Sequence, residues 1–374
     1  MGAFPDEPEH FYHWLQTQKY TYRPDDFVPR RIYGDYLEQI LTQTEQESVA
    51  RGHTIKRVSG SVTAAAWNAR DAYFTLSVGE ETIRASLLVL ACGTQSAAEI
   101  GIQSWRWFSG GYGPETNYAL LKQPEIHILG TGLTTVDACL TLSTLGYSGP
   151  IIAHSHHGWL PAAHAATESI PAPDWAQAPA LHPRSAAALM LHIRRAAKNA
   201  PWRAVMDALR PHTTALWQSL PPKEQARVFA HVFAAWNIHR HRMAPQIAAK
   251  IQAMQNSGQL ILRRGRIERE HVTPLMLDCT GPSYDITRSR QPLLMQLLAQ
   301  DCIRPAKNGV GIATTSKLEA EGAAKGRIYA LGALIVGDWF ECTAVPSLRE
   351  QAQRVAQALA AVHDGDIPAT LAAK

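Results

Sequence analysis

The fold is decided by residues 125–155, which read EIHILGTGLTTVDACLTLSTLGYSGPIIAHS. An apolar run ends at Gly130, and Gly132 follows two positions later. Residues 138–145 then continue at helical spacing, Gly146 stops the helix, and a second apolar run follows. A strand, a glycine turn, a helix and a second strand within about thirty residues are typical of a nucleotide-binding βαβ unit.

The glycine turn predicts a phosphate at the start of the helix. Glycine lets backbone amides approach a pyrophosphate, and the unpaired N–H groups of a helix N-terminus attract its charge. The third glycine of the full GxGxxG pattern is replaced by Thr135, so a plain strand-to-helix turn is the alternative. On the first interpretation, the coenzyme-binding residues are Gly130, Thr131, Gly132, Leu133 and Thr134.

The end of the second strand bears on the choice of coenzyme. An acid at this position would favour NADH by binding ribose hydroxyls, and none is present. Ser155, His156 and His157 stand there instead and are suited to a 2′-phosphate, which favours NADPH over NADH. Histidines in such a loop also occur without any ligand, which is the alternative.

The composition is that of a globular protein with room for two or three domains. Its 374 residues are 46% hydrophobic and 18% charged. No segment approaches the roughly 18 consecutive apolar residues of a membrane span. The first residues also lack the basic and then apolar order of a signal peptide. We therefore expect a cytoplasmic protein with no membrane partner.

The cysteines are far apart and form no CxxC pair or metal-ligand spacing. We therefore expect structural thiols and no metal site. A disulfide-exchanging oxidoreductase needs a paired reactive thiol, so the sequence excludes that class of enzyme. The thiols are those of Cys92, Cys139, Cys279, Cys302 and Cys342.

Positive charge is concentrated in one block. The formal net charge is +4, but residues 181–270 contain 15 Lys and Arg against 4 Asp and Glu. A phosphorylated cofactor, an anionic substrate or a nucleic acid would explain this block, and so would a solvated helical face. The run HRHR at 239–242 has two similar interpretations, because it either complements a helix C-terminus or binds an anion.

Patterning along the chain predicts the α/β class. A helix with Tyr36, Leu37, Ile40 and Leu41 on its apolar side precedes three antiparallel strands, VTAAAWN, YFTLSV and TIRASLLVLACG. After the βαβ unit, prolines divide residues 186–254 into several helices. Strands then return in GQLILRRGRIE, TPLMLDCTG and GRIYALGAL, and a helix follows them. A chain that leaves one sheet and later returns to it has a nested two-domain design.

Three strands end in a glycine at a loop: LLVLACGTQ, LMLDCTGPS and RIYALGAL. In doubly wound folds, ligands lie outside such strand ends. Together with FVPRRIYGDYL, LGTGLTTVD, WNIHRHRMAP and IYALGALIVGDWFECTAVPSLREQA, they make most of the chain resemble the FAD/NAD(P)-binding flavoproteins with two dinucleotide-binding domains. The resemblance implies a nested Rossmann-like fold and the cofactors FAD and NADPH or NADH. We expect a flavin domain at 1–122 and 271–374, an NAD(P) domain at 123–170 and 259–270, and an all-helical insert at 171–258.

On the flavin side the resemblance points to five residues. Arg30 lies in a segment that borders the flavin domain in similar proteins, and Gly93 and Gly281 follow strands. Gly332 matches a Gly-Asp position at the ribityl chain, although no acid follows it here. Thr343 is expected to cap the final helix, whose N-terminus points at the isoalloxazine in flavoproteins. Helix capping and aromatic packing alone are the alternative explanation for Arg30 and Thr343.

The resemblance also implies a missing unit. Members of such families open with a strand, a GxGxxG turn and a helix, a unit of roughly 30 residues or more. The present sequence opens with MGAFPDEPEHFYHWL, which matches the segment after that unit. We expect an incomplete chain in preference to natural loss. If the unit is truly lost, an unpaired sheet edge would favour a homo-oligomer.

The leading hypothesis is an FAD-dependent oxidoreductase in which NAD(P)H delivers hydride to the flavin. The reduced flavin would pass electrons onward, with oxygen and a small organic substrate as acceptors in a monooxygenase-like reaction. Such cofactors carry the chemistry themselves, so the absence of a recognisable set of catalytic residues is expected. The alternative is a truncated or degenerate dinucleotide-binding or sensory protein without turnover. No nucleic-acid partner is expected, because the basic residues belong to no known recognition module.

Overall fold

The computed structural model describes residues 2–95, 104–106, 119–265, 267 and 276–363. The chain divides into two compact units. Unit 1 comprises Met1–Gly93, Arg290–Ala306 and Gly311–Lys374, and unit 2 comprises Thr94–Ser289 and Lys307–Val310. The chain therefore builds part of unit 1, then unit 2, and then returns, as a nested design requires.

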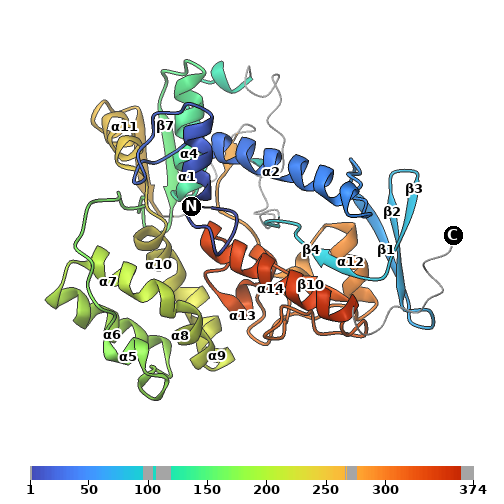
Figure 1. The fold of residues 1–374 in the computed structure, drawn as a ribbon. Helices are drawn as coiled ribbons and strands as arrows, with labels where there is room; N and C mark the ends of the chain where they lie inside the picture. Colours follow the sequence, from blue (N-terminus) through green and yellow to red (C-terminus); the bar gives the residue numbers. More distant parts are fainter. Residues whose placement is uncertain (1, 96–103, 107–118, 266, 268–275, 364–374) are drawn as a thin grey trace. The chain divides into compact units, whose positions relative to one another are not determined.

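Unit 1 combines helices with two small sheets (Figure 1). Strands β1, β2 and β3 form an antiparallel sheet in that order, and β4 pairs in parallel with β10. In chain order the elements are α1 (His10–Thr17), α2 (Arg30–Ala50), β1 (Val62–Asn68), β2 (Tyr73–Val78), β3 (Glu81–Ala85), β4 (Leu88–Leu90), α12 (Pro292–Ala299), β10 (Ile328–Ala330), η7 (Gly332–Ile335), α13 (Val336–Trp339) and α14 (Val345–His363).

The third strand that the sequence predicts is two strands in the structure. The segment TIRASLLVLACG breaks after Ala85, and β4 leaves the antiparallel sheet to pair with β10. Leu88 and Leu90 are buried while Val89 between them is 41% exposed. The alternation places one face of β4 in the core, and that burial outweighs continuation of the antiparallel ladder.

A compact aromatic cluster joins α1 and α2. Phe11 and Leu15 pack against Ile32 and Tyr36, and the Tyr36 hydroxyl accepts the backbone N–H of Ala3 at 2.9 Å. The wide apolar side predicted for α2 is wrong, because Leu37 and Leu41 are 42% and 38% exposed. The helix is held by a narrow strip that includes Tyr36, and the neighbouring leucines face away from it.

Unit 2 contains a five-stranded parallel sheet in the order β5-β9-β6-β7-β8. Its elements are β5 (Ser104–Arg106), β6 (Ile126–Leu129), α4 (Leu133–Thr144), β7 (Ile151–Ser155), α5 (Asp174–Gln177), η2 (Pro179–Leu181), α6 (Ala186–Asn199), α7 (Trp202–Leu209), η3 (Arg210–His212), α8 (Thr213–Ser219), α9 (Pro222–Arg227), η4 (Val228–Val232), α10 (Phe233–Arg240), α11 (Pro245–Asn256), β8 (Leu260–Arg264), β9 (Met276–Asp278) and η6 (Ile286–Arg288).

The predicted βαβ unit is present as β6, α4 and β7. All of β6 and nearly all of β7 is buried, as expected for strands of a parallel sheet that is covered on both faces. Leu142 of α4 and Ile251 of α11 pack into one core with Ile128 and Ile151 of the strands. This packing fixes the carboxyl ends of β6 and β7 relative to the start of α4.

The strands and helices after the βαβ unit are distributed differently from the sequence prediction. The predicted helices are present, and in Figure 1 α5 to α9 gather away from β7 while α10 leads back toward the sheet. The predicted boundary at 270/271 lies outside the described residues. However, β9 pairs with β6, and β5 pairs with β9, so both strands belong to the sheet of unit 2 and not to unit 1. The sheet that a strand joins depends on its pairing with segments far away in the chain, and the local sequence pattern does not indicate that pairing.

Substitution of Leu142 tests the role of α4 in this core. Its side chain is fully buried, so Leu142→Ala should lower the free energy of unfolding by about 2–5 kcal/mol through lost burial and a residual cavity. Leu145, which directly follows the helix and is 36% exposed, provides the matched control. Leu145→Ala should cost less than about 1 kcal/mol in urea unfolding. Equal losses would mean that α4 does not dock through Leu142.

Candidate functional site

The turn after β6 brings two backbones into direct contact. At Gly130 the φ angle is +100°, and an added Cβ would lie 2.3 Å from the carbonyl oxygen of Cys279. The amide of Cys279 donates to the carbonyl of Leu129 at 2.8 Å. Only glycine fits at this position. The segment after β9 therefore lies directly against the predicted phosphate turn.

The N-terminus of α4 is open. Gly132 is its N-cap residue, with an extended backbone (φ −77°, ψ −168°) and no side-chain cap. An added Cβ at Gly132 would meet no atom within 4 Å. The amides at the start of α4, those of Leu133 and Thr134, precede any possible partner within the helix itself. An anionic group is stabilised by such amides and by the helix dipole.

Thr135 explains the missing third glycine. Its side chain is fully buried, and its hydroxyl donates to the carbonyl of Gly130 at 2.9 Å. The threonine in the first turn of α4 therefore stabilises the glycine turn by this hydrogen bond. The departure from the GxGxxG pattern leaves the turn intact.

The order of the sheet places this turn at a switch point. From β6 the chain continues to β7 and β8 on one side, and it returns later to β9 on the other side. Ligands of open parallel sheets bind at the carboxyl ends of the strands where the order reverses in this way. Gly281, which follows β9, and the residues from Gly130 to Thr134 lie at these strand ends.

The loop after β7 is held by a chain of hydroxyl groups. Thr131 donates to the carbonyl of Trp159, and its oxygen lies 2.9 Å from that of Ser155. Ser155 accepts the amide of Gly158 at 2.9 Å. Each hydroxyl has one proton, so Ser155 donates its proton to Thr131. In this arrangement both side chains hold the loop, and His156 and His157 are left as the predicted groups for a phosphate.

A basic residue that the sequence prediction missed lies beside this loop. Arg264 on β8 pairs in register with Ser155, and a Cβ on Gly158 would lie 3.6 Å from that of Arg264. The run LILRRGR was the only local signal for it. Its distance along the chain from the βαβ unit hid its relation to His156.

In unit 1 the structure brings together Gly93 and Gly332. They follow β4 and β10, which pair in parallel, so both glycines lie at the same end of that sheet. The amide of Gly332 donates to Gln351 Oε1 at 2.8 Å, and Gln351 Nε2 donates to the carbonyl of Cys342 at 2.8 Å. The Gly332 turn is thereby fixed to the segment that enters α14. Arg30 is exposed at the first position of α2.

The capping role predicted for Thr343 is wrong. The final helix begins at Val345, so the residue before it is Ala344, and Leu348 donates its amide to that carbonyl at 2.9 Å. Pro346 lies in the first turn, which suits proline because the first amides have no helical partner. Thr343 still directly follows Cys342, whose carbonyl is bonded to Gln351, the side chain that also holds the Gly332 amide.

The surroundings of the cysteines indicate a structural role. All five are free, and four are buried. Burial raises the pKa of the Cys139 and Cys342 thiols to about 12, and burial also raises the pKa of Cys279. A thiol with so high a pKa is a poor nucleophile. Within the described ranges, no three His, Cys, Asp or Glu side chains are placed to hold a metal ion.

The HRHR run lies at the end of α10, in a basic cluster around Trp202. The guanidinium carbons of Arg203 and Arg242 lie 4.3 and 6.0 Å from the centre of the Trp202 ring. Arg242 forms an ion pair with Asp207, and its side chain is only 3% exposed. Arg242 therefore has a structural role, while His239 and Arg240 lie in the last helical turn, where they complement the dipole.

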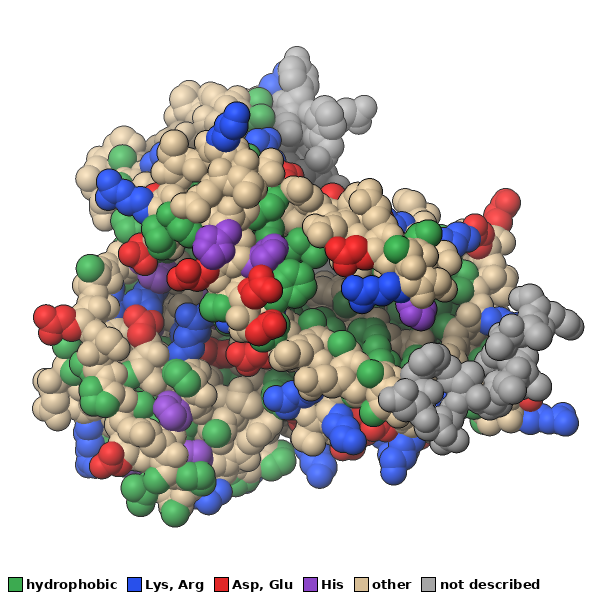
Figure 2. Space-filling view, viewed as in Figure 1, with side chains coloured by type: hydrophobic (Ala, Val, Ile, Leu, Met, Phe, Trp, Pro, Cys, Tyr) green, Lys and Arg blue, Asp and Glu red, His purple; other side chains and the backbone are tan. Residues whose placement is uncertain are grey.

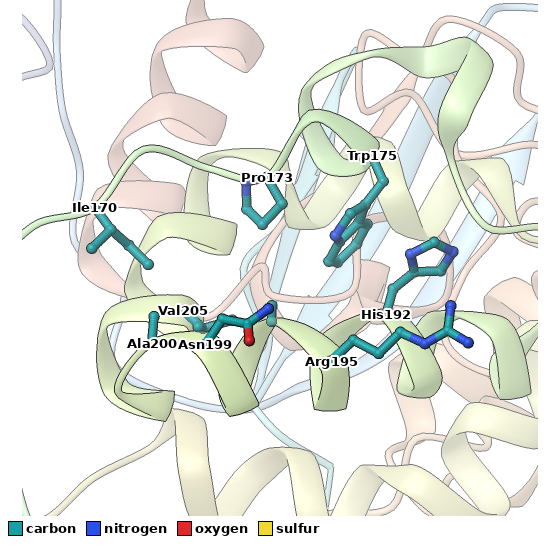
Figure 3. A pocket seen from close by; sticks show the side chains of 9 residues that line it. Ile170, Pro173, Trp175, His192, Arg195, Asn199, Ala200 and Val205 are labelled. Atoms are coloured by element: carbon teal, nitrogen blue, oxygen red, sulfur yellow. The ribbon is translucent and has the colours of Figure 1, made fainter.

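A separate cavity lies among the helices of unit 2. It has a volume of about 410 Å³ and contains none of the sequence-predicted site residues. In Figure 3, Pro173 and Trp175 face His192, Arg195 and Asn199 of α6 across it. On the face drawn in Figure 2, Lys and Arg side chains are interspersed with acids and form no single basic patch.

Comparison with known proteins supports the same fold. A family model described as FAD-NAD(P)-binding matches residues 1–95. No curated protein matches the chain. Among solved structures, the ornithine N-hydroxylase of Kutzneria sp. 744 with reduced FAD, NADP+ and L-ornithine superposes with a TM-score of 0.57 at 13% identity, over 94% of this chain and 83% of that one. For the FAD-bound cadaverine monooxygenase DfoA of Erwinia amylovora the TM-score is 0.59 at 12% identity, over 96% and 80%.

The ornithine hydroxylase PvdA of Pseudomonas aeruginosa superposes with a TM-score of 0.54 at 14% identity, over 95% of this chain and 82% of that one. The predicted α/β fold and the resemblance to FAD/NAD(P)-binding flavoproteins are thus confirmed. Among the helices of the described ranges, none has both the length and the apolar character needed to cross a membrane. The predicted absence of a first βαβ unit stays a prediction.

The basic cluster predicts a pH dependence of stability through His164. Burial, and then the charge of Arg242, lower the pKa of His164 below its ordinary value of 6.5. As the pH falls through about 6.5, the unfolded chain takes up a proton that the folded chain resists, so stability declines toward acid. The charge of Asp207 opposes the trend, and those of Arg203 and Arg240 reinforce it.

His164→Gln should therefore lose less stability than the natural protein between pH 7 and pH 5. Urea unfolding at several pH values measures the difference. The exposed His53 supplies the control, and His53→Gln should follow the natural curve. An unchanged slope for His164→Gln would contradict the assignment.

Proposed function

We propose that this protein is an FAD-dependent oxidoreductase that uses NAD(P)H, and that the turn between β6 and α4 binds the coenzyme pyrophosphate. The observation that carries the proposal is the uncapped N-terminus of α4 with open space at Gly132. The match of residues 1–95 to an FAD-NAD(P)-binding model supports the flavin half. The flavoprotein fold supports the pairing of the two cofactors.

The residues of unit 2 would hold NAD(P)H. The amides of Gly132, Leu133 and Thr134 face the pyrophosphate, and Thr131 with Ser155 fixes the loop beside it. Arg264 would supply positive charge, and His156 a ring nitrogen for a hydrogen bond, to the 2′-phosphate of NADPH. Gly130 contacts the backbone of Cys279, where no side chain fits, and contributes to coenzyme binding only through the shape of the turn.

The residues of unit 1 would hold FAD, which supplies the capacity to accept hydride and pass electrons onward. Gly93 has a φ of +67° and no atom within 4 Å of an added Cβ, so a ligand has room to approach this strand end. Gln351 fixes the Gly332 turn, and α14 presents its N-terminal dipole. Thr343 and Arg30 are further candidates for contact, and Gly281 belongs with the coenzyme side.

The substrate in this proposal is a small molecule. The structural neighbours act on ornithine and cadaverine, so amine-bearing compounds are the first class to assay with NADPH and oxygen. A dinucleotide-binding protein without turnover is the second candidate, favoured by the Gly332 amide, which is already bonded to Gln351. Purified protein that binds NADPH, yet fails to oxidise it after addition of FAD, would establish the second candidate.

Gly132→Ala tests the pyrophosphate site directly. The backbone at Gly132 suits alanine and no protein atom lies nearby, so the variant should fold normally. Its methyl group would push a phosphate away from the amides, and we expect NADPH binding to weaken about tenfold or more, since charge-assisted hydrogen bonds are lost. Calorimetric titration with NADPH measures the effect.

Gly34→Ala in α2 is the matched control, because an added Cβ there also meets no atom within 4 Å. It should bind NADPH like the natural protein. Unchanged affinity in Gly132→Ala would place the pyrophosphate elsewhere, and a natural protein that binds neither NADPH nor NADH would refute the proposed function.

Arg264→Ala tests the preference for NADPH. Loss of one charged contact to the 2′-phosphate should weaken NADPH binding about tenfold and leave NADH binding unchanged. Arg263 points to the opposite face of β8, so Arg263→Ala is the control. An equal effect of Arg264→Ala on both coenzymes would show that this side chain does not read the 2′-phosphate.

A further inference from the structure

The cavity among the helices of unit 2 has the size and lining of a small-molecule site. Its volume of about 410 Å³ is within the range of roughly 300–1,000 Å³ that is usual for such sites. The polar lining residues are His192, Arg195 and Asn199, and no acid lines the cavity. The apolar lining residues are Ile170, Pro173, Trp175, Ala196, Ala200 and Val205. An apolar cavity with a few polar groups is the usual form of a ligand site.

One wall of the cavity is a strip of α6 that the core does not use. Leu189 and Ile193 of this helix are buried. His192, Ala196 and Asn199 follow one another at helical spacing and line the cavity. The core therefore anchors α6 through one strip and leaves the adjacent strip for the cavity.

The opposite wall is the segment around α5, which hydrogen bonds hold in place. Gln177 Nε2 donates to the carbonyl of Ala172, and His182 Nε2 donates to the carbonyl of Ala176 at 3.1 Å. Trp175 lies within this segment, and the centre of its ring is 5.1 Å from that of His192. Both walls are thus formed without a ligand, which lowers the cost of ordering on binding.

The two ends of the cavity differ in chemistry (Figure 3). Ile170, Ala200 and Val205 lie at one end, and His192 and Arg195 lie at the other. Val205 is 1% exposed, so the apolar end reaches into the protein. The polar end opens to the solvent, because Arg195 is exposed and His192 is only partly buried. A ligand with an apolar body and a polar head group matches this arrangement.

The basic residues of α6 favour a negative head group. Arg194, Arg195 and Lys198 lie on this helix, and its sequence contains no acid. None of the three forms an ion pair with a described residue. Arg195 is the one that lines the cavity, where its guanidinium group suits the two oxygens of a carboxylate.

We propose that this cavity binds a small apolar carboxylate, with its hydrocarbon body between Ile170 and Val205 and its carboxylate at Arg195. Contact of the body with the apolar walls supplies the affinity, and Arg195 selects for the negative charge. The cavity shares no residue with the coenzyme turn, so this inference does not depend on the proposed function.

Arg195→Gln tests the selection for charge. Phenylbutyrate is the carboxylate to titrate, and phenylbutanol has the same apolar body without the charge. The variant should bind phenylbutyrate about three- to tenfold more weakly, since solvent screens an exposed ion pair, and should bind phenylbutanol like the natural protein. Arg194→Gln is the matched control, because Arg194 is exposed and lies outside the lining, and it should change neither affinity. Ligand-observed NMR titration measures the dissociation constants.

Ala196→Leu tests the cavity itself. The larger side chain would fill the space between the walls, so both compounds should bind about tenfold more weakly or worse, and thermal unfolding checks the fold. No saturable binding of phenylbutyrate to the natural protein, or unchanged affinities in Arg195→Gln and Ala196→Leu, would overturn the inference. Light scattering that shows a dimer, converted to a monomer by Ala196→Leu, would assign this surface to a second copy of the chain and would also overturn it.

Discussion

The contact between Gly130 and the backbone of Cys279 is the constraint on which the candidate site depends. A side chain at Gly130 would lie 2.3 Å from a carbonyl oxygen, so the ends of β6 and β9 adjoin only because this residue is glycine. That approach places the Thr280 amide at the turn and allows Asp278 to hold it. Two residues later, Gly132 is the N-cap residue of α4 and has no side chain that could cap the helix. The glycine at position 130 thus determines how closely the ends of β6 and β9 approach at the turn.

The polar groups around the turn fall into two sets: those that bond to other protein groups, and those that have no partner among the described residues. The hydroxyls of Thr131, Thr135 and Ser155 all bond to protein groups, and together they fix the loop after β7 and the glycine turn. The amides at the start of α4 and the Oδ2 atom of Asp278 have no such partners among the described residues. Rigid loops with unused polar atoms are what a binding site requires, because the cost of ordering is met before the ligand arrives.

The sequence predicted those features that depend on neighbouring residues. Residues 125–155 carry the strand, turn, helix and strand in one local pattern, so the βαβ unit was found with its boundaries. Arg264 and Asp278 escaped notice because pairing between strands more than a hundred residues apart brings them to the site. The same cause misplaced β9 among the domains. The cap predicted at Thr343 failed for a local reason, since the helix begins at Val345, one residue later than a cap at Thr343 requires.

The two sides of the turn carry different residues, which matters because a dinucleotide could bind at the turn in either of two directions. The coenzyme is two nucleotides joined at a pyrophosphate, so the helix terminus that binds the centre does not by itself define which end lies where. In unit 2 the two sides differ, because Arg264 lies on the β8 side and Asp278 on the β9 side. A coenzyme proposed to bind in the reverse direction would lose the charge-assisted hydrogen bond to Arg264, roughly 1.5–3 kcal/mol, and would bring its phosphate toward the β9 side. In the proposed function, the 2′-phosphate would therefore lie on the β8 side, where Arg264 attracts it, and not on the β9 side.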